Sequence, residues 1–159
     1  MAKATNPIPK GYHTITPSLT CRDAAKAIDF YKKAFGAQEL MRMPSPDGKV
    51  SHAEIKIGDS VVFVSDEFPG MSAAPSPTAA PSYSLFLYLE DVDTIFNRAV
   101  SAGARVDMPM QDMFWGDRFG KVTDPFGHQW GLAMHIEDVA ADEIGRRAAA
   151  FYAKAAGQK

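Results

Sequence analysis

Residues 19–23, Leu19-Thr20-Cys21-Arg22-Asp23, have a counterpart at residues 87–91, Leu87-Tyr88-Leu89-Glu90-Asp91. In both stretches an alternating, strand-like run ends at an aspartate that can cap a helix. Farther along, Ile57-Gly58 in the first half corresponds to Phe126-Gly127 in the second, and each pair precedes a final strand. A repeat of this length predicts two copies of one supersecondary unit.

Each copy has the pattern of a strand, a helix and three further strands. After Asp23 the apolar residues recur at helical spacing until Gly36, and after Asp91 they recur until Gly103. The flanking segments alternate between apolar and polar residues, as half-buried strands do. We therefore predict an α+β fold of two βαβββ modules with an added C-terminal helix.

The same patterns divide the chain into five segments. They are an N-terminal arm (1–13), module one (14–67), a linker rich in Pro and Ala (68–82), module two (83–135) and a C-terminal helix (136–159). The linker holds four prolines and few side chains large enough to pack, which is typical of a linker or a mobile flap. Within the first strand, predicted over residues 14–21, Pro17 favours an edge position or a bulge.

Composition and charge exclude several classes of function. A net charge of −2 gives no electrostatic case for binding nucleic acid or an anionic membrane. No apolar run approaches the ~20 residues that span a bilayer, and the N-terminus lacks the apolar region of a signal peptide. A single cysteine, Cys21, rules out an internal disulfide framework. We expect a cytoplasmic protein without nucleic-acid or membrane partners.

Several motifs resemble those of the vicinal oxygen chelate superfamily, which includes glyoxalase I, extradiol dioxygenases, and the bleomycin and fosfomycin resistance proteins. The resemblance covers residues 14–135 and is carried by Arg22–Tyr31, Phe35-Gly36-Ala37, Ala102-Gly103-Ala104 and Asp124–His128. Ser51–Glu54, Gly58-Asp59-Ser60 and Trp115–Arg118 are similar to the branch called PhnB-like. The resemblance implies two modules whose curled sheets form a U-shaped cleft, often completed in a homodimer.

In the enzymes of this superfamily, the cleft holds a divalent metal bound by the first and last strands of each module. Those positions fall here on Thr16, Ser84, Val62 (or its neighbour Phe63) and Gly131. None of them is His, Asp or Glu, the oxygen and nitrogen ligands that such a metal needs. We therefore expect no metal or other cofactor at the superfamily's site.

His52 and Glu54 are the candidate catalytic residues. Spaced by two on one predicted strand, they share a face and could act as a general base pair, or as two ligands of a displaced metal site. The alternative is a solvated strand face on which Lys56 completes a charge ladder.

The candidate ligand-binding residues are six side chains expected around the cleft: Thr16, Ser84, Phe86, Tyr88, Trp115 and Arg118. Trp115 and Arg118 could form a stacking and anion-binding corner. The alternative is a structural ion pair of Arg118 with Asp117 or Asp124. We expect His128 to be exposed, and Cys21 and Trp130 to belong to the core.

These observations indicate a protein that binds a small organic molecule in the cleft, without metal, and that forms a homodimer. The alternative is a lyase, isomerase or dioxygenase of the same superfamily that uses a non-standard site at His52 and Glu54. A third reading is an interaction protein whose dimer surface, including the C-terminal helix, carries the function.

Overall fold

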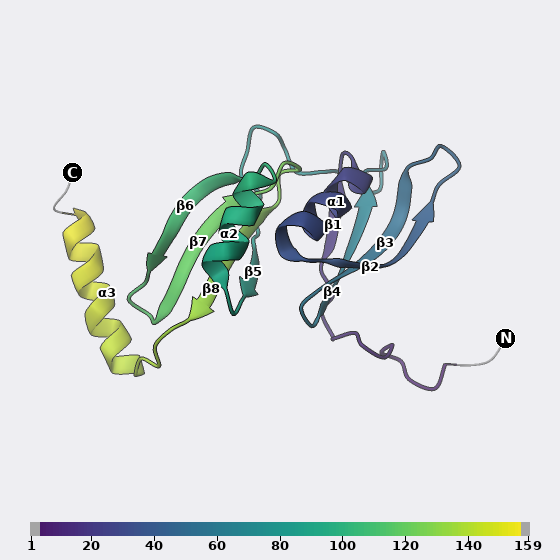
Figure 1. Ribbon diagram of the computed structural model, residues 1–159. Helices are drawn as coiled ribbons and strands as arrows, with labels where there is room; N and C mark the ends of the chain where they lie inside the picture. The colour runs from purple at the N-terminus through teal and green to yellow at the C-terminus, as the bar shows by residue number, and fades with distance from the viewer. Residues whose placement is uncertain (1–3, 157–159) are drawn as a thin grey trace.

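The computed structural model describes residues 4–156, whose elements repeat the order β-α-β-β-β and end on a helix (Figure 1). Module one consists of β1 (Ser18–Cys21), α1 (Ala24–Phe35), β2 (Gln38–Pro44), β3 (Val50–Ile57) and β4 (Ser60–Asp66). Module two consists of β5 (Leu85–Tyr88), α2 (Val92–Ser101), β6 (Arg105–Asp112), β7 (Asp117–Thr123) and β8 (Gln129–His135). Helix α3 (Ala141–Ala156) follows.

The two sheets have the same topology. Their strand orders are β1-β4-β3-β2 and β5-β8-β7-β6. In each sheet the first strand pairs in parallel with the last, and the other pairs are antiparallel. The prediction of two βαβββ modules with an added C-terminal helix is confirmed.

Both module helices begin at the aspartates that define the repeat. The Asp23 carboxylate accepts the backbone N–H of Lys26 at 3.1 Å, and Asp91 accepts that of Thr94 at 3.3 Å. Each bond satisfies an amide that has no partner inside the helix. Helix α1 ends at Gly36, whose φ of 68° is left-handed and therefore suits glycine.

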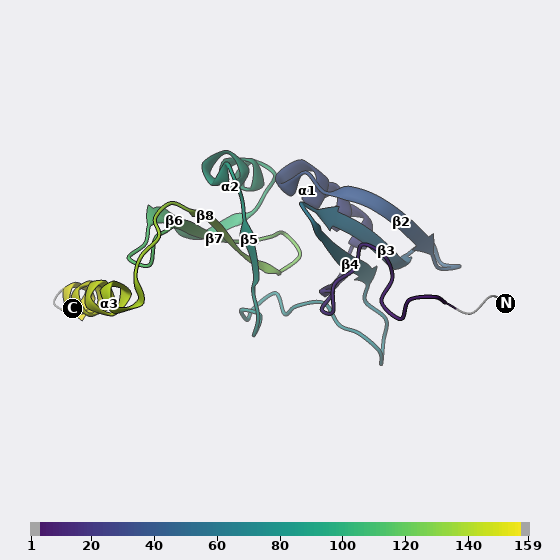
Figure 2. The same cartoon turned by 90° about the horizontal axis from the view of Figure 1, so that it is seen from below.

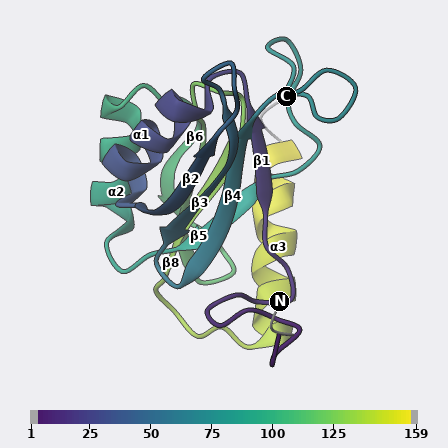
Figure 3. The same cartoon turned by 90° about the vertical axis from the view of Figure 1, so that its right-hand side faces the viewer.

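The helices and the two sheets form separate layers. Helices α1 and α2 lie side by side on one side of the sheets, whereas the N-terminal arm and the linker lie on the other (Figure 2). Figure 3 shows the same layering from the end of the molecule. We call the sheet surface away from α1 and α2 the open face. Helix α3 stands apart at the far end of module two and has no buried residue among those described.

The first strand is shorter than predicted, because regular pairing begins only at Ser18. Pro17 lacks the N–H that a strand would donate, although its carbonyl still accepts the Phe63 N–H at 2.9 Å. The segment between β4 and β5 contains one isolated bridge, between Phe68 and Ser72.

One aromatic core joins the modules. Trp130 of β8 is fully buried, and its ring lies 5.4 Å from that of Tyr31 and 4.8 Å from that of Phe35, both on α1. Trp130 is therefore a core residue, as predicted. Outside this core, Arg98 of α2 donates to the Lys33 carbonyl of α1 at 3.0 Å. The cleft between the modules thus rests on a shared, packed base.

Candidate functional site: the cleft between the modules

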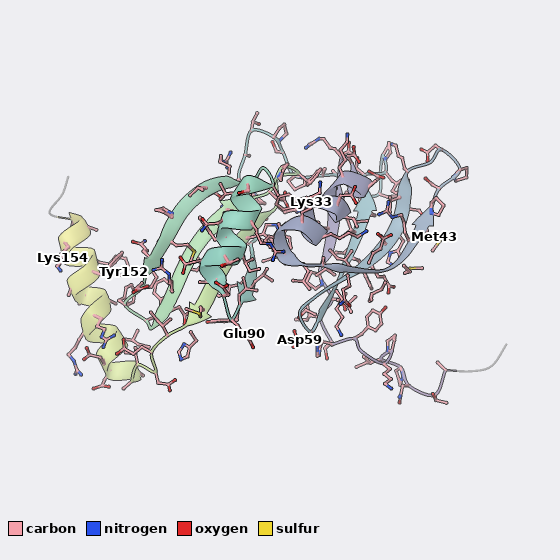
Figure 4. The ribbon with its side chains drawn as sticks, viewed as in Figure 1. Lys33, Met43, Asp59, Glu90, Tyr152 and Lys154 are labelled. Carbon is pink, nitrogen blue, oxygen red and sulfur yellow. The ribbon has the colours of Figure 1, made fainter. Side chains whose placement is uncertain are left out.

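Two hollows open where the modules meet, and Phe86 and Leu87 of β5 line both. A cavity of about 210 Å³ lies between β5 and the start of β4, at Ser60 to Val62. A wider groove of about 730 Å³ runs past the Gly58-Asp59 turn to Glu90. Asp59 and Glu90 lie on either side of the gap between the modules (Figure 4). Strand β5 therefore lines both hollows of the cleft.

The open face of module two forms an aromatic wall, which we define as Phe86, Tyr88, Trp115 and Phe119. The Phe86 and Phe119 rings stack at 5.4 Å and an interplanar angle of 7°. Tyr88 lies 5.1 Å from Phe86, and Trp115 lies 5.9 Å from Phe119. Phe86 and Tyr88 are 48% and 65% exposed, so large apolar surfaces stand free at the cleft.

A buried carboxylate, Asp117, fixes the polar ends of this wall. One of its oxygens accepts the Tyr88 hydroxyl at 3.0 Å and the Trp115 indole N–H at 2.9 Å. The other accepts Nδ1–H of His135 at 2.9 Å. The hydrogen bond to Asp117 raises the pKa of Tyr88, because ionising the phenol would break it. Asp117 therefore holds Tyr88 and Trp115 in fixed orientations.

The predicted Trp115–Arg118 corner is not assembled. Trp115 bonds to Asp117 on the open face, whereas Arg118 turns toward α2 and pairs with both Asp93 oxygens at 2.6 and 2.7 Å. A third bond joins Arg118 to Asp112 at 2.9 Å. The guanidinium is thus held in a structural ion-pair network. The alternative interpretation also gave Arg118 a structural ion pair, but with Asp117 or Asp124 as its partner.

His52 and Glu54 do lie together on the open face of module one. His52 Nε2 is 3.2 Å from Glu54 Oε1, and its ring meets Phe63 edge-on at 4.8 Å. The other Glu54 oxygen accepts the hydroxyl of Tyr12, a residue of the N-terminal arm. This bond lowers the pKa of Glu54, because a donor at the carboxylate favours its charged form. Sequence reasoning missed Tyr12, since no local pattern links the arm to β3.

The two predicted ligand-binding hydroxyl residues, Thr16 and Ser84, lie in different surroundings. Thr16 lines the 210 Å³ cavity, and it also lines a second cavity of about 410 Å³ beneath the arm. Ser84 is exposed in the segment that leads into β5. Within residues 4–156, no hydrogen bond or ion pair joins Trp115 or Arg118 to His52 or Glu54.

The prediction that His128 is exposed is wrong. His128 is fully buried where the linker meets both modules, and Nε2–H donates to the Thr20 carbonyl at 3.1 Å. Its Nδ1 accepts the Tyr83 hydroxyl at 2.7 Å. Burial lowers the pKa of His128, because the charged ring would lose water that these neutral partners do not replace. The sequence Asp124–Gly127, just before His128, is typical of an exposed turn. The local sequence therefore gives no sign that His128 is buried.

Cys21 is a buried core residue, as predicted, with its sulfur 3.5 Å from His128 Nε2. Burial, reinforced by the charge of Asp124, raises the pKa of Cys21 to about 12. The thiol therefore stays protonated near neutral pH, in a form that is a poor nucleophile.

The comparison with known proteins agrees with this architecture. Residues 12–132 match the family model described as the glyoxalase/bleomycin resistance protein/dioxygenase superfamily. The chain belongs to this superfamily. An uncharacterized Mycobacterium tuberculosis protein, Rv0887c, is 45% identical over 134 residues, which cover 82% of this chain and 79% of that protein.

Solved structures extend the likeness. TioX from Micromonospora sp. ML1 has a TM-score of 0.63 and 31% identity, over 78% of this chain and 99% of its own. A PhnB protein from Bacillus cereus, described as a putative 3-demethylubiquinone-9 3-methyltransferase, has a TM-score of 0.61 and 22% identity, over 77% and 99% of the two chains. The latter supports the fold alone. No helix within residues 4–156 is long and apolar enough to cross a membrane.

The residues present do not fit the divalent metal that members of this superfamily can hold. At Gly131, an added Cβ would lie 2.9 Å from Phe86 and 3.0 Å from Phe119, so aromatic rings fill the space of a ligand side chain. In module one, the last-strand residue on the open face is Phe63, which pairs with Glu54. Within residues 4–156, no group of three or more His, Cys, Asp or Glu side chains is placed to hold a metal ion.

Proposed function

We propose that this superfamily member binds a small, planar, mainly apolar organic molecule in the cleft, by stacking it on the aromatic wall. The observation that carries the proposal is the Phe86–Phe119 stack over Gly131. It sets two nearly parallel rings over Gly131, the position at which the resemblance would place a metal ligand. Stacking on aromatic side chains is favourable for flat ligands and needs no metal.

The surroundings of the wall support the same ligand class. The 210 Å³ cavity is lined mainly by apolar side chains, among them Val62, Leu85 and Trp130. Thr16 also lines this cavity, and its hydroxyl can donate or accept a hydrogen bond. A few polar groups around an apolar pocket are typical of sites for small organic molecules.

The proposal is tested by titrating the protein with prodan, a neutral and planar naphthalene dye whose emission shifts to the blue in apolar surroundings. Phe86→Ala removes the exposed ring of the stack, and we expect binding about tenfold weaker. Tyr152→Ala is the control, because it also removes an exposed aromatic side chain, from α3 and away from the cleft. Equal affinity for prodan in the wild type and in Phe86→Ala would contradict the proposal.

The second candidate function is proton transfer by His52 and Glu54, which is favoured by their 3.2 Å contact. In this reading the pair acts on an acidic C–H bond of a carbonyl compound, as in an isomerase or lyase. The test is the isomerisation of a hemithioacetal formed from methylglyoxal and glutathione. Turnover by the wild type that disappears in His52→Ala would establish this function. Equal turnover by the wild type and His52→Ala would contradict it.

We also propose that two copies of the chain form a homodimer that encloses the cleft. The exposure of Phe86 and Tyr88 on the open face supports this, because a large apolar surface seldom stays uncovered. Sedimentation equilibrium of the wild type is expected to give twice the monomer mass. Tyr88→Asp places a charge in this surface and is expected to give the monomer mass.

A further inference from the structure

We propose that Tyr12 is a tethered pseudo-ligand of a second binding site, on the open face of module one, and that this site takes small phenolic molecules. The inference goes beyond both candidate functions, because it concerns a binding site formed by Tyr12, Phe63 and Glu54, in which Glu54 accepts a hydrogen bond and does not transfer a proton. In this site the arm's phenol occupies the position of the free ligand, which binds by displacing it.

The arm is shaped to present Tyr12 to the sheet. Residues 9–12 form a tight turn in which the Tyr12 N–H donates to the Pro9 carbonyl at 3.2 Å. Gly11, at the third position of this turn, has a φ of 90°, which the type II turn requires and glycine permits. The chain then enters β1 through Thr16 and Pro17. The position of Tyr12 therefore follows from a defined turn rather than from chance contact.

The contacts of Tyr12 are those of a bound phenol. Its ring lies 6.2 Å from that of Phe63 at an angle of 55°, within the range of favourable aromatic pairs. Its hydroxyl donates to Glu54, whose side chain is only 18% exposed. The second Glu54 oxygen is oriented by His52, at 3.2 Å. An aromatic ring and a charged acceptor, held at the right separation, recognise an aryl hydroxyl group.

The space around Tyr12 is large enough for exchange. The cavity beneath the arm measures about 410 Å³ and is lined by the arm, Thr16, Glu54 and Phe63. No helix or strand holds residues 7–14, so the arm can leave without breaking a sheet. A short tether gives Tyr12 an effective concentration in the millimolar range. To displace it, a free phenol must be present at a higher concentration or bind more tightly. The arm thus sets the threshold at which the site fills.

The test measures binding of 4-fluorophenol to the full chain by fluorine NMR, with 4-fluorotoluene as the probe that lacks the hydroxyl. Tyr12→Ala empties the site, and we expect it to bind 4-fluorophenol about tenfold more tightly than the wild type does. Tyr12→Phe keeps the ring but loses the donor, so a smaller gain is expected. Tyr152→Ala, an exposed tyrosine on α3, is expected to leave the affinity unchanged.

A double variant identifies the acceptor. In Tyr12→Ala/Glu54→Leu, the preference for 4-fluorophenol over 4-fluorotoluene is expected to vanish. In the wild type, saturating 4-fluorophenol is expected to abolish the nuclear Overhauser effect between the Tyr12 and Phe63 rings. The proposal is overturned if Tyr12→Ala binds 4-fluorophenol no better than the wild type does, or binds both probes equally. Because Phe86 is intact in every variant, these outcomes do not depend on the aromatic wall.

Discussion

Gly131 lies beneath two stacked aromatic rings, Phe86 and Phe119, at the centre of the aromatic wall. The resemblance to the superfamily predicts a metal ligand at its place in β8, and here that residue has no side chain at all. Phe86 pairs with it across the parallel β5–β8 ladder and, with Phe119, covers it. A single glycine thus allows two rings to stack where another residue would project into the cleft.

A methyl group at this position is expected to disturb the wall. In Gly131→Ala the new Cβ would lie within 3.0 Å of both rings, closer than such contacts normally come, so Phe86 must move. We expect a loss of stability of about 1–3 kcal/mol and weaker prodan binding. Gly145→Ala is the control, since Gly145 lies in α3 with no atom near its Cβ position. There the change is expected to stabilise by about 0.5–1 kcal/mol. Urea unfolding measures both, and equal effects of the two substitutions would contradict this account.

His128 makes stability depend on pH. Its folded pKa lies below the unfolded value of about 6.5, so the unfolded chain binds more protons in the range between the two values. Stability therefore rises with pH across that range. The contribution of His128 is complete above about pH 6.5 and is lost as pH falls through the folded pKa.

This dependence is measurable in a variant. We expect the free energy of unfolding of the wild type to fall between about pH 8 and about pH 5.5. The fall is expected to be smaller in His128→Gln, which keeps polar atoms near Thr20 and Tyr83 but does not titrate. Urea titrations at the two pH values give the comparison. An identical pH dependence in both proteins would show that His128 is not the group responsible.

Among the elements, α1 and the β7–β8 hairpin are joined by one buried carboxylate. Asp124 accepts the Tyr31 hydroxyl at 2.8 Å and the Trp130 indole N–H at 2.9 Å. It also accepts the backbone N–H groups of Phe126 and His128. The turn that it begins is therefore an anchor between the modules, and not only a reversal of the chain.

Removing one donor from this anchor is expected to destabilise the whole protein. Tyr31→Phe keeps the buried ring but leaves Asp124 without one hydrogen bond, at a cost of about 2 kcal/mol. Tyr152→Phe is the control, because Tyr152 is 63% exposed on α3. Thermal unfolding should show a lower midpoint for Tyr31→Phe alone. A Tyr31→Phe midpoint equal to that of the wild type would contradict the role of Asp124 as an anchor between the modules.

The elements themselves could be predicted from the sequence, whereas several site contacts could not. The fold contains the helices that the apolar spacing after Asp23 and Asp91 predicts, and the strands that alternation predicts, because both patterns are local. The contacts of Asp124 with Tyr31, and of Tyr12 with Glu54, join residues far apart in the chain. Such contacts depend on how modules and arm pack, which no periodicity encodes. Arg118 shows the same limit, since its partner Asp93 lies on α2, and the local patterns do not show that this helix packs beside Arg118.

On the scale of the whole molecule, the two modules share one core and leave their open faces on the same side, where the arm and the linker lie. The cleft between them follows from this arrangement, with β5 at its centre. We propose that the ligand of this cleft stacks on the aromatic wall, and that the arm governs a separate site on module one. The central claim is therefore the position of a planar ligand on the aromatic wall.

The most direct test is to locate bound prodan by nuclear Overhauser effects, using protein with labelled phenylalanine rings and a chelator in the buffer. Stacking in the cleft predicts effects from the naphthalene protons of prodan to the rings of Phe86 and Phe119. Phe151 on α3, which is 41% exposed, serves as the internal control for nonspecific contact. Effects to Phe151 without any to Phe86 and Phe119, or no prodan binding in this chelator-containing buffer, would contradict the account.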